Sequence, residues 1–118
     1  MLFKCSKVEK YLLENSLMDE RRIWCYAEMR AQFATKHYPF YAFVLVCVNG
    51  EKLYLFVTKF NSTVMDLYYE CKIDELQDVS IKKKLLNVAR LSFVNKSDKI
   101  KLDMQKWNQF SSLIKASN

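Results

Sequence analysis

The feature that most constrains this chain is a pair of apolar segments joined by its only glycine. Residues 41–48 and 51–58 are rich in β-branched and aromatic side chains, and they flank Asn49-Gly50. Asn-Gly is the preferred pair for a two-residue type I′ turn, because both central residues then need a positive φ. The pattern predicts a β-hairpin with Val48 opposite Glu51. Both faces of this hairpin are apolar, which predicts a central place in a sheet or cover on both sides.

Alternation of apolar and polar residues predicts further strands on both sides of the hairpin. Residues 23–33 have apolar side chains at a period of two, although their composition also suits a helix. After the hairpin, residues 64–73 alternate, and shorter strands are predicted at 79–81, 86–94 and 99–104. The side chains of 64–73 that we expect to face inward are Met65, Leu67, Tyr69, Cys71 and Ile73.

Each end of the chain has helical periodicity. Residues 6–17 form an amphipathic pattern, and Ser6 followed by Glu9 is typical of a capping box. Residues 104–116 place their large apolar side chains on one stripe, which we expect to pack on the sheet. That stripe consists of Trp107, Phe110, Leu113 and Ile114.

These elements fit one domain spanning residues 1–118, because a single core usually serves roughly 100–150 residues. We expect a mainly β fold in which the N-terminal helix at about 6–17 precedes a barrel or sandwich of antiparallel strands at about 23–104. The helix at about 104–116 would then cap the sheet.

The order of elements over residues 23–116 resembles a pleckstrin-homology-like (PH-like) domain, especially the small bacterial kind. Thr58-Lys59-Phe60 is similar to the T-[DN]-[KR] step that follows the long hairpin of that family. Residues 72–79 look like its I-P-[LY]-x-x-I-x-x-V corner, and Ile100-Lys101-Leu102 leads into the final helix as in that family. The resemblance implies about seven strands in two near-orthogonal sheets, with a C-terminal capping helix and an extra N-terminal helix.

The lipid-binding signature of the PH-like family is absent. Members that bind phosphoinositides carry a Lys-x-n-Arg-x-Arg pattern in the loop after the first strand. Here the corresponding stretch has only Lys36, His37 and the preceding Arg30. The resemblance therefore does not extend to recognition of inositol lipids.

Positive charge is concentrated in the last third of the chain. Of 19 Lys/Arg and 13 Asp/Glu, residues 79–118 hold nine basic and two acidic side chains, so this part carries +7 and the remainder carries −1, which gives the net charge of +6. The run Lys82-Lys83-Lys84 is the candidate binding site, and it is predicted to lie in a loop between strands. It is either a solvated loop or a docking patch for an acidic protein or an anionic membrane.

Residues suited to catalysis or metal binding are few. One glycine cannot form the glycine-rich loops that bind nucleotide phosphates. His37 is the only histidine, and no nucleophile motif surrounds Cys25 or Cys47, its conceivable partners. The four cysteines are widely spaced and do not form close zinc-ligand pairs. We therefore expect no catalytic residue, no metal site and no cofactor.

A fold without evident chemistry predicts a non-catalytic interaction module, most of all for a protein partner or for self-association. Two alternatives stay open: an anionic membrane or nucleic acid bound by the basic C-terminal third, and a small enzyme with a cryptic cysteine nucleophile. Nucleic acid is disfavoured because Trp107 belongs to the helix stripe and the RNP1 pattern is missing. The absence of a leader or an apolar span predicts a soluble, cytoplasmic chain.

Overall fold

The protein is built on one curled, seven-stranded antiparallel sheet with the strand order β4-β3-β2-β1-β7-β6-β5. The computed structural model describes residues 5–36, 39–58, 65–84, 86–105 and 107–117. The strands are β1 (Trp24–Gln32), β2 (Phe40–Asn49), β3 (Lys52–Thr58), β4 (Met65–Lys72), β5 (Leu76–Lys83), β6 (Ala89–Asn95) and β7 (Asp98–Met104). A short 3₁₀ turn, η1 (Ile73–Glu75), links β4 to β5. The predicted mainly β fold is confirmed, and its strands form one continuous sheet rather than two separate ones.

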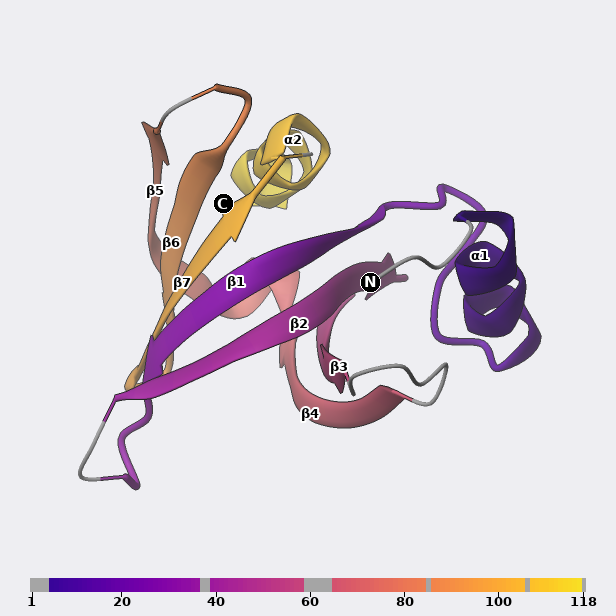
Figure 1. Ribbon diagram of the computed structural model, residues 1–118. Coiled ribbons are helices and arrows are strands. Elements are labelled where there is room, and N and C mark those ends of the chain that lie inside the picture. Colours follow the sequence, from indigo (N-terminus) through magenta and orange to yellow (C-terminus); the bar gives the residue numbers. More distant parts are fainter. Residues whose placement is uncertain (1–4, 37–38, 59–64, 85, 106, 118) are drawn as a thin grey trace.

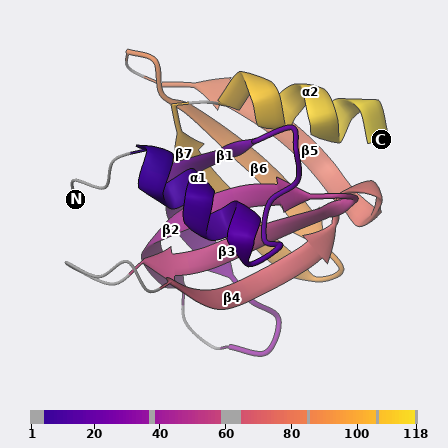
Figure 2. The same cartoon turned by 90° about the vertical axis from the view of Figure 1, so that its right-hand side faces the viewer.

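The two helices lie on different parts of this sheet. Figure 1 shows α2 (Trp107–Ser117) at one open end of the curl, near β5, β6 and β7. In Figure 2, α1 (Cys5–Glu14) lies across the outer side of β2 and β3. The inner side of the sheet and α2 enclose the main core, while α1 covers a second apolar cluster on the outer side.

The ambiguous stretch before the hairpin is a strand, as its alternation predicts. Cys25, Ala27, Met29 and Ala31 of β1 are buried in the main core. A helix would have spread these side chains over several faces, whereas in a strand they all point inward. The same logic holds for β7, whose Ile100, Leu102 and Met104 are buried on the inner side.

The hairpin forms, but its register differs from the prediction by two residues. Val48 lies opposite Leu53, and Asn49 lies opposite Lys52. The two-residue turn is therefore Gly50-Glu51, in which Gly50 has φ +64° and Glu51 has no positive φ. That combination suits a type II′ turn, which needs glycine at its first central position. A shift of two residues keeps the same side chains on the inner face.

Strand β4 contains a β-bulge that the alternation does not reveal. Its register against β3 shifts between Leu55 and Phe56, which pair with Tyr69 and Leu67 respectively. Tyr68 is the extra residue, so the residues before it are turned to the opposite face. The prediction that Leu67 faces inward is thus wrong, and Leu67 is 48% exposed.

The segment around Lys82–Lys84 is also different from the prediction. Strand β5 runs to Lys83, and the turn to β6 begins there rather than at Lys82. Leu86, predicted to lie in a strand, is in this turn with φ +61° and is 97% exposed. The pairing of Lys82 with Arg90 and of Lys83 with Ala89 extends the strand.

Helix α2 packs as the stripe predicts. Phe110 and Ile114 are fully buried, and Trp107 and Leu113 are partly buried against the same core. The helix begins later than predicted, because Met104 still pairs with Ala27 and Ala89 in the sheet.

Helix α1 ends at Glu14, earlier than predicted, in a Schellman-type cap. Ser16 has φ +55°, its N–H donates to Leu13 O, and the N–H of Leu17 donates to Leu12 O. Glu9 of this helix accepts hydrogen bonds from Trp24 Nε1 at 3.1 Å and from Arg22 Nη1 at 3.4 Å. The buried apolar cluster between this helix and the sheet consists of Val8, Leu12, Met18, Trp24, Leu45, Cys47 and Phe56.

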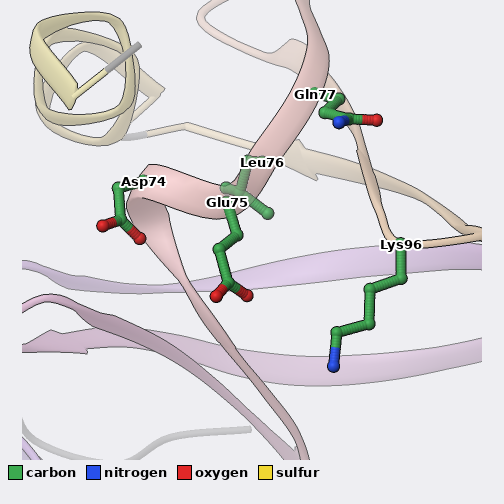
Figure 3. A pocket seen from close by; sticks show the side chains of 5 residues that line it. All are labelled: Asp74, Glu75, Leu76, Gln77 and Lys96. Carbon is green, nitrogen blue, oxygen red and sulfur yellow. The ribbon is translucent and has the colours of Figure 1, made fainter.

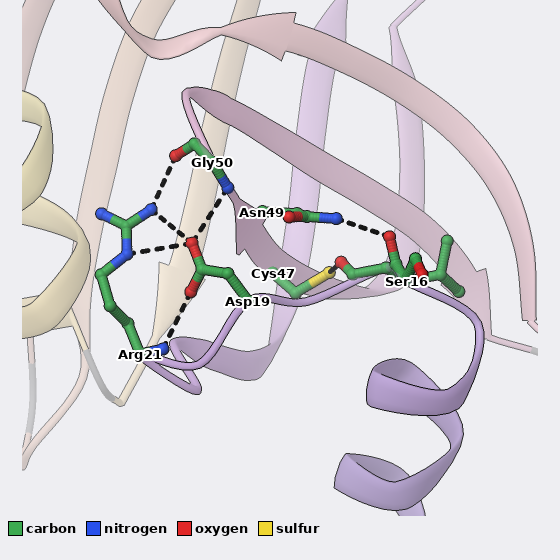
Figure 4. Close-up of polar contacts among 7 residues, drawn as sticks. Ser16, Asp19, Arg21, Cys47, Asn49 and Gly50 are labelled. Atoms are coloured by element: carbon green, nitrogen blue, oxygen red, sulfur yellow. Dashed lines mark hydrogen bonds and ion pairs between the residues drawn. The ribbon is translucent and has the colours of Figure 1, made fainter.

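The chain between α1 and β1 is fastened to the hairpin turn (Figure 4). Asp19 Oδ2 accepts from the N–H of Gly50 at 2.9 Å, and Arg21 Nη2 donates to Gly50 O at 2.6 Å. Asn49 Nδ2 donates to Ser16 O. Burial alone would raise the pKa of Asp19, but the hydrogen bonds from Arg21 and Gly50 outweigh it and hold that pKa below its usual value.

Candidate functional site on the outer face of the sheet

The three lysines predicted as a binding site do not share one surface. Lys82 points outward beside Arg90, its cross-strand neighbour. Lys83 turns toward α2, where its Nζ lies 5.4 Å from the centre of the Trp107 ring. Lys84 Nζ lies 3.4 Å from Asp103 Oδ2 on β7. Successive residues of a strand point to opposite faces, so a basic run in β5 cannot form a continuous patch.

The Lys84 contact belongs to an ion-pair cluster centred on Asp103. Arg90 donates through Nε and Nη2 to the two Asp103 oxygens at 2.8 and 3.1 Å. The Asp103 side chain is only 8% exposed. The hydrogen bonds from Arg90 hold the pKa of Asp103 below its usual value, against the opposing effect of burial. Two of the cations on the outer face, Arg90 and Lys84, thus share one carboxylate.

A second pair of cations on the same face lacks such a counter-ion. Arg30 of β1 lies directly opposite Lys101 of β7, and both are exposed. Within the described residues neither makes an ion pair with a carboxylate. Like charges directly opposite each other destabilise a sheet, so this arrangement is not explained by stability. The pair is therefore a candidate contact for a negatively charged group.

A cross-strand pair of lysines elsewhere in the sheet has the carboxylate that the Arg30–Lys101 pair lacks within the described residues. Lys52 of β3 lies opposite Lys72 of β4, on a different part of the sheet. Here Lys52 Nζ is 3.5 Å from Glu70 Oε2, so a carboxylate offsets the repulsion. This pair provides a matched reference for the Arg30–Lys101 pair.

Two exposed aromatic rings lie beside Arg30. Tyr41 and Phe43 of β2 are 48% and 58% exposed, and their ring centres are 5.8 Å apart. The Arg30 guanidinium lies over the Tyr41 ring at 5.0 Å, and Tyr41 Oη donates to Glu28 Oε1 at 3.0 Å. Because the two exposed rings are adjacent, they make this part of the face a candidate interaction site.

The position of α1 explains why these rings are uncovered. The later part of β2, from Val44 to Val48, is buried on both faces because α1 covers its outer side. The earlier part alternates, with Phe40 and Ala42 packed on the main core and the two rings facing outward. In Figure 1 this part of β2 runs toward the β1–β2 connection, away from α1.

Together these side chains form a surface that we name the basic–aromatic face. It spans five neighbouring strands in the order β2-β1-β7-β6-β5. Cross-strand pairing aligns Tyr41, Arg30, Lys101 and Ser92 in one row. Its defining residues are Arg30, Tyr41, Phe43, Lys82, Lys99 and Lys101.

Other parts of the described chain offer less chemistry. Burial raises the pKa of the Cys47 and Cys71 thiols to about 12, so little thiolate forms near neutral pH. Cys25 is also buried, and His37 lies outside the described residues. Among the described residues no group of three or more His, Cys, Asp or Glu side chains could hold a metal ion.

A shallow hollow lies outside the β4–β5 corner (Figure 3). It is lined by Asp74, Glu75, Leu76, Gln77 and Lys96. Of these only Leu76 is buried, so the charged groups remain in solvent. Such a hollow lacks the apolar enclosure of a small-molecule site.

Most of the basic–aromatic face is not apparent from the sequence. Of its members only Lys82 belongs to the predicted site. In the sequence, Tyr41 and Phe43 have the pattern of core residues in an apolar hairpin. Arg30 and Lys101 become neighbours only through the pairing of β1 with β7. The positive charge of residues 79–118 was the available signal, since Lys82, Lys99 and Lys101 all come from that part.

Comparisons with known proteins give no family for this chain. No protein-family model matches it, and no curated protein matches it. In the part of the chain that the structure describes, neither helix has the length and apolarity to cross a membrane.

Proposed function

We propose that this chain is a non-catalytic interaction module of PH-like fold that binds a negatively charged macromolecule through the basic–aromatic face. The observation that carries the proposal is the cross-strand pair of Arg30 and Lys101, which is exposed, lacks a carboxylate partner in the described chain and lies beside the exposed Tyr41 ring. The meander of strands and the C-terminal helix at one open end support the PH-like assignment.

The charge of the face restricts the partner. An acidic protein, an anionic membrane and a nucleic acid all carry the complementary charge. A second copy bound face to face is less favourable, because it would bring together two surfaces of the same net charge. Arg and aromatic side chains are also the types that contribute most at protein interfaces.

Site-specific photo-crosslinking in cells that express the protein tests the proposal whatever the partner is. A benzophenone amino acid at position 43 should give covalent adducts. The same group at Gln109, an exposed residue of α2, serves as the control. Adducts from position 43 alone support the proposed face. Equal adducts from both positions, or none from position 43, would count against it.

A further inference from the structure

If, as proposed above, the basic–aromatic face is an interaction site, its chemistry also specifies the partner. We propose that this face binds single-stranded nucleic acid, with a base stacked on the Phe43 ring and the adjoining phosphates bound by Arg30 and Lys101. RNA and DNA both supply what the face requires, which is a base for stacking and phosphates for the cations.

The arrangement of rings and cations fits a nucleotide repeat. Phe43 and Arg30 are diagonal neighbours across β2 and β1, a relation that places the two residues about 7–8 Å apart. Lys101 continues the row on β7, opposite Arg30. Proteins that bind single strands combine aromatic stacking platforms with cations along the backbone path, and they do so on open sheet faces as well as in grooves.

An acidic protein fits these observations less well. The core of a protein interface is apolar and poor in lysine, with charges at the rim. Here the two rings are bordered by Arg30 and Glu28 on β1, and the row continues through Lys101 to the hydroxyl residue Ser92. Contact with a protein would bury these polar groups around a small apolar centre, whereas a phosphate chain would satisfy the cations directly.

A membrane and a duplex fit less well for geometric reasons. Phe43 lies within β2, which is paired with β1, and its carbonyl accepts a hydrogen bond from Thr58 of β3. A ring held in the middle of a sheet cannot reach below lipid headgroups as a residue at a loop tip can. In a duplex the bases are stacked on each other, so their faces are not accessible to Phe43.

Fluorescence anisotropy with labelled twelve-nucleotide oligo-U and oligo-dT tests the proposal on the full chain. We expect dissociation constants of roughly micromolar order in low salt, with affinity falling as salt rises. Binding to either oligonucleotide supports the proposal, and the stronger of the two shows whether the 2′-hydroxyl contributes. Absence of binding to both at 100 μM protein (about the weak end of non-specific affinity) would overturn it.

Matched variants locate the binding. The double variant Arg30→Gln with Lys101→Gln should weaken binding at least about tenfold. It should also reduce the steepness of log affinity plotted against log salt concentration by about 1.4, since each lost phosphate contact on a single strand removes about 0.7 from that slope. Lys52→Gln with Lys72→Gln removes the same charge from the reference pair and should change affinity less than about twofold. Equal losses from the two double variants would mean a diffuse charge effect and would refute the site.

Substitutions of Phe43 separate stacking from simple charge attraction. Phe43→Leu keeps an apolar side chain without a ring and should weaken binding at least about fivefold, whereas Phe43→Trp should retain it with quenching of the new indole. Equal affinity of Phe43→Leu and the wild type refutes the stacked base. Far-UV circular dichroism confirms that each variant is folded, which is expected because this side chain is exposed.

Two further probes distinguish failure of this inference from failure of the proposed function. Vesicles containing phosphatidylserine and a labelled polyglutamate peptide are offered to the same variants. Binding of either probe that depends on Arg30 and Lys101, with no oligonucleotide binding, would overturn the nucleic-acid proposal and leave the interaction face standing. Oligonucleotide binding that depends on Phe43 supports both.

Discussion

Replacing Asp103 with Asn should destabilise the fold while strengthening its attraction for polyanions. Asp103 accepts two hydrogen bonds from Arg90 at 2.8 and 3.1 Å, and Lys84 Nζ lies 3.4 Å away. Removing one partner of a buried ion pair costs about 3–5 kcal/mol. Arg90 and Lys84 are 22% and 37% exposed and can turn to water, so we expect a smaller loss of about 2 kcal/mol in the free energy of unfolding.

The pH dependence of this loss follows from the pKa of Asp103. Hydrogen bonds from Arg90 keep that pKa below its usual value in the folded protein. The carboxylate therefore stabilises the fold fully above the unfolded pKa of about 3.9, and its contribution disappears as pH falls through the lower folded pKa. The difference between wild type and Asp103→Asn should be constant near pH 7 and should shrink in more acidic solution.

Urea denaturation followed by circular dichroism at pH 7 and pH 3 measures this difference. Asp74→Asn, at an exposed position in η1, is the control for the change of charge. We expect Asp74→Asn to alter the free energy of unfolding by less than about 0.5 kcal/mol. A loss below that value for Asp103→Asn at pH 7, or an equal loss at both pH values, would refute the role given to this cluster. In the anisotropy assay, Asp103→Asn should bind oligonucleotides several-fold more tightly than the wild type. The control, Asp74→Asn, should change the affinity less than twofold.

Three other predictions concern the core and the thiols. Leu12 is fully buried where α1 contacts the sheet, so Leu12→Ala should lower the free energy of unfolding by about 3 kcal/mol and increase hydrogen exchange in α1. A loss under about 1 kcal/mol would contradict that packing. Tyr69→Phe should cost about 1–2 kcal/mol in urea denaturation, because the phenol accepts from Asn95 and donates to Asp98, both at 2.8 Å; an unchanged midpoint and slope would contradict this. Cys47 and Cys71, with thiol pKa values near 12, should resist labelling by a disulfide reagent at pH 8 until urea unfolds the chain, and rapid native labelling of either would point instead to a reactive cysteine.

Much of the fold could be predicted because its signals are local. The alternation of β1 and β7 identified the side chains that the main core buries, and the stripe of α2 identified its packed face. The bulge at Tyr68 could not be predicted, because the register of β4 depends on its pairing with β3 rather than on its own sequence. The hairpin register depended similarly on the turn, where Gly50 occupies the first central position instead of the second.

The candidate site was harder to predict because it is assembled from distant parts of the chain. Arg30 and Lys101 belong to opposite ends of the sequence and meet where β7 joins β1. The exposure of Phe43 depends on how much of β2 is covered by α1, which no local pattern determines. The run Lys82–Lys84 was visible in the sequence, but a strand divides its side chains between two faces.

The most direct test of the basic–aromatic face is a map of backbone amide chemical shifts, recorded by NMR while oligo-U or oligo-dT is titrated into the labelled protein. The largest changes should fall on residues 28–32, 41–43 and 99–103, which are neighbours across β1, β2 and β7. Amides of α2 and of the Lys52–Lys72 pair should change little. Saturable changes centred on those reference regions, with the basic–aromatic face unaffected, would contradict the site proposed for this protein.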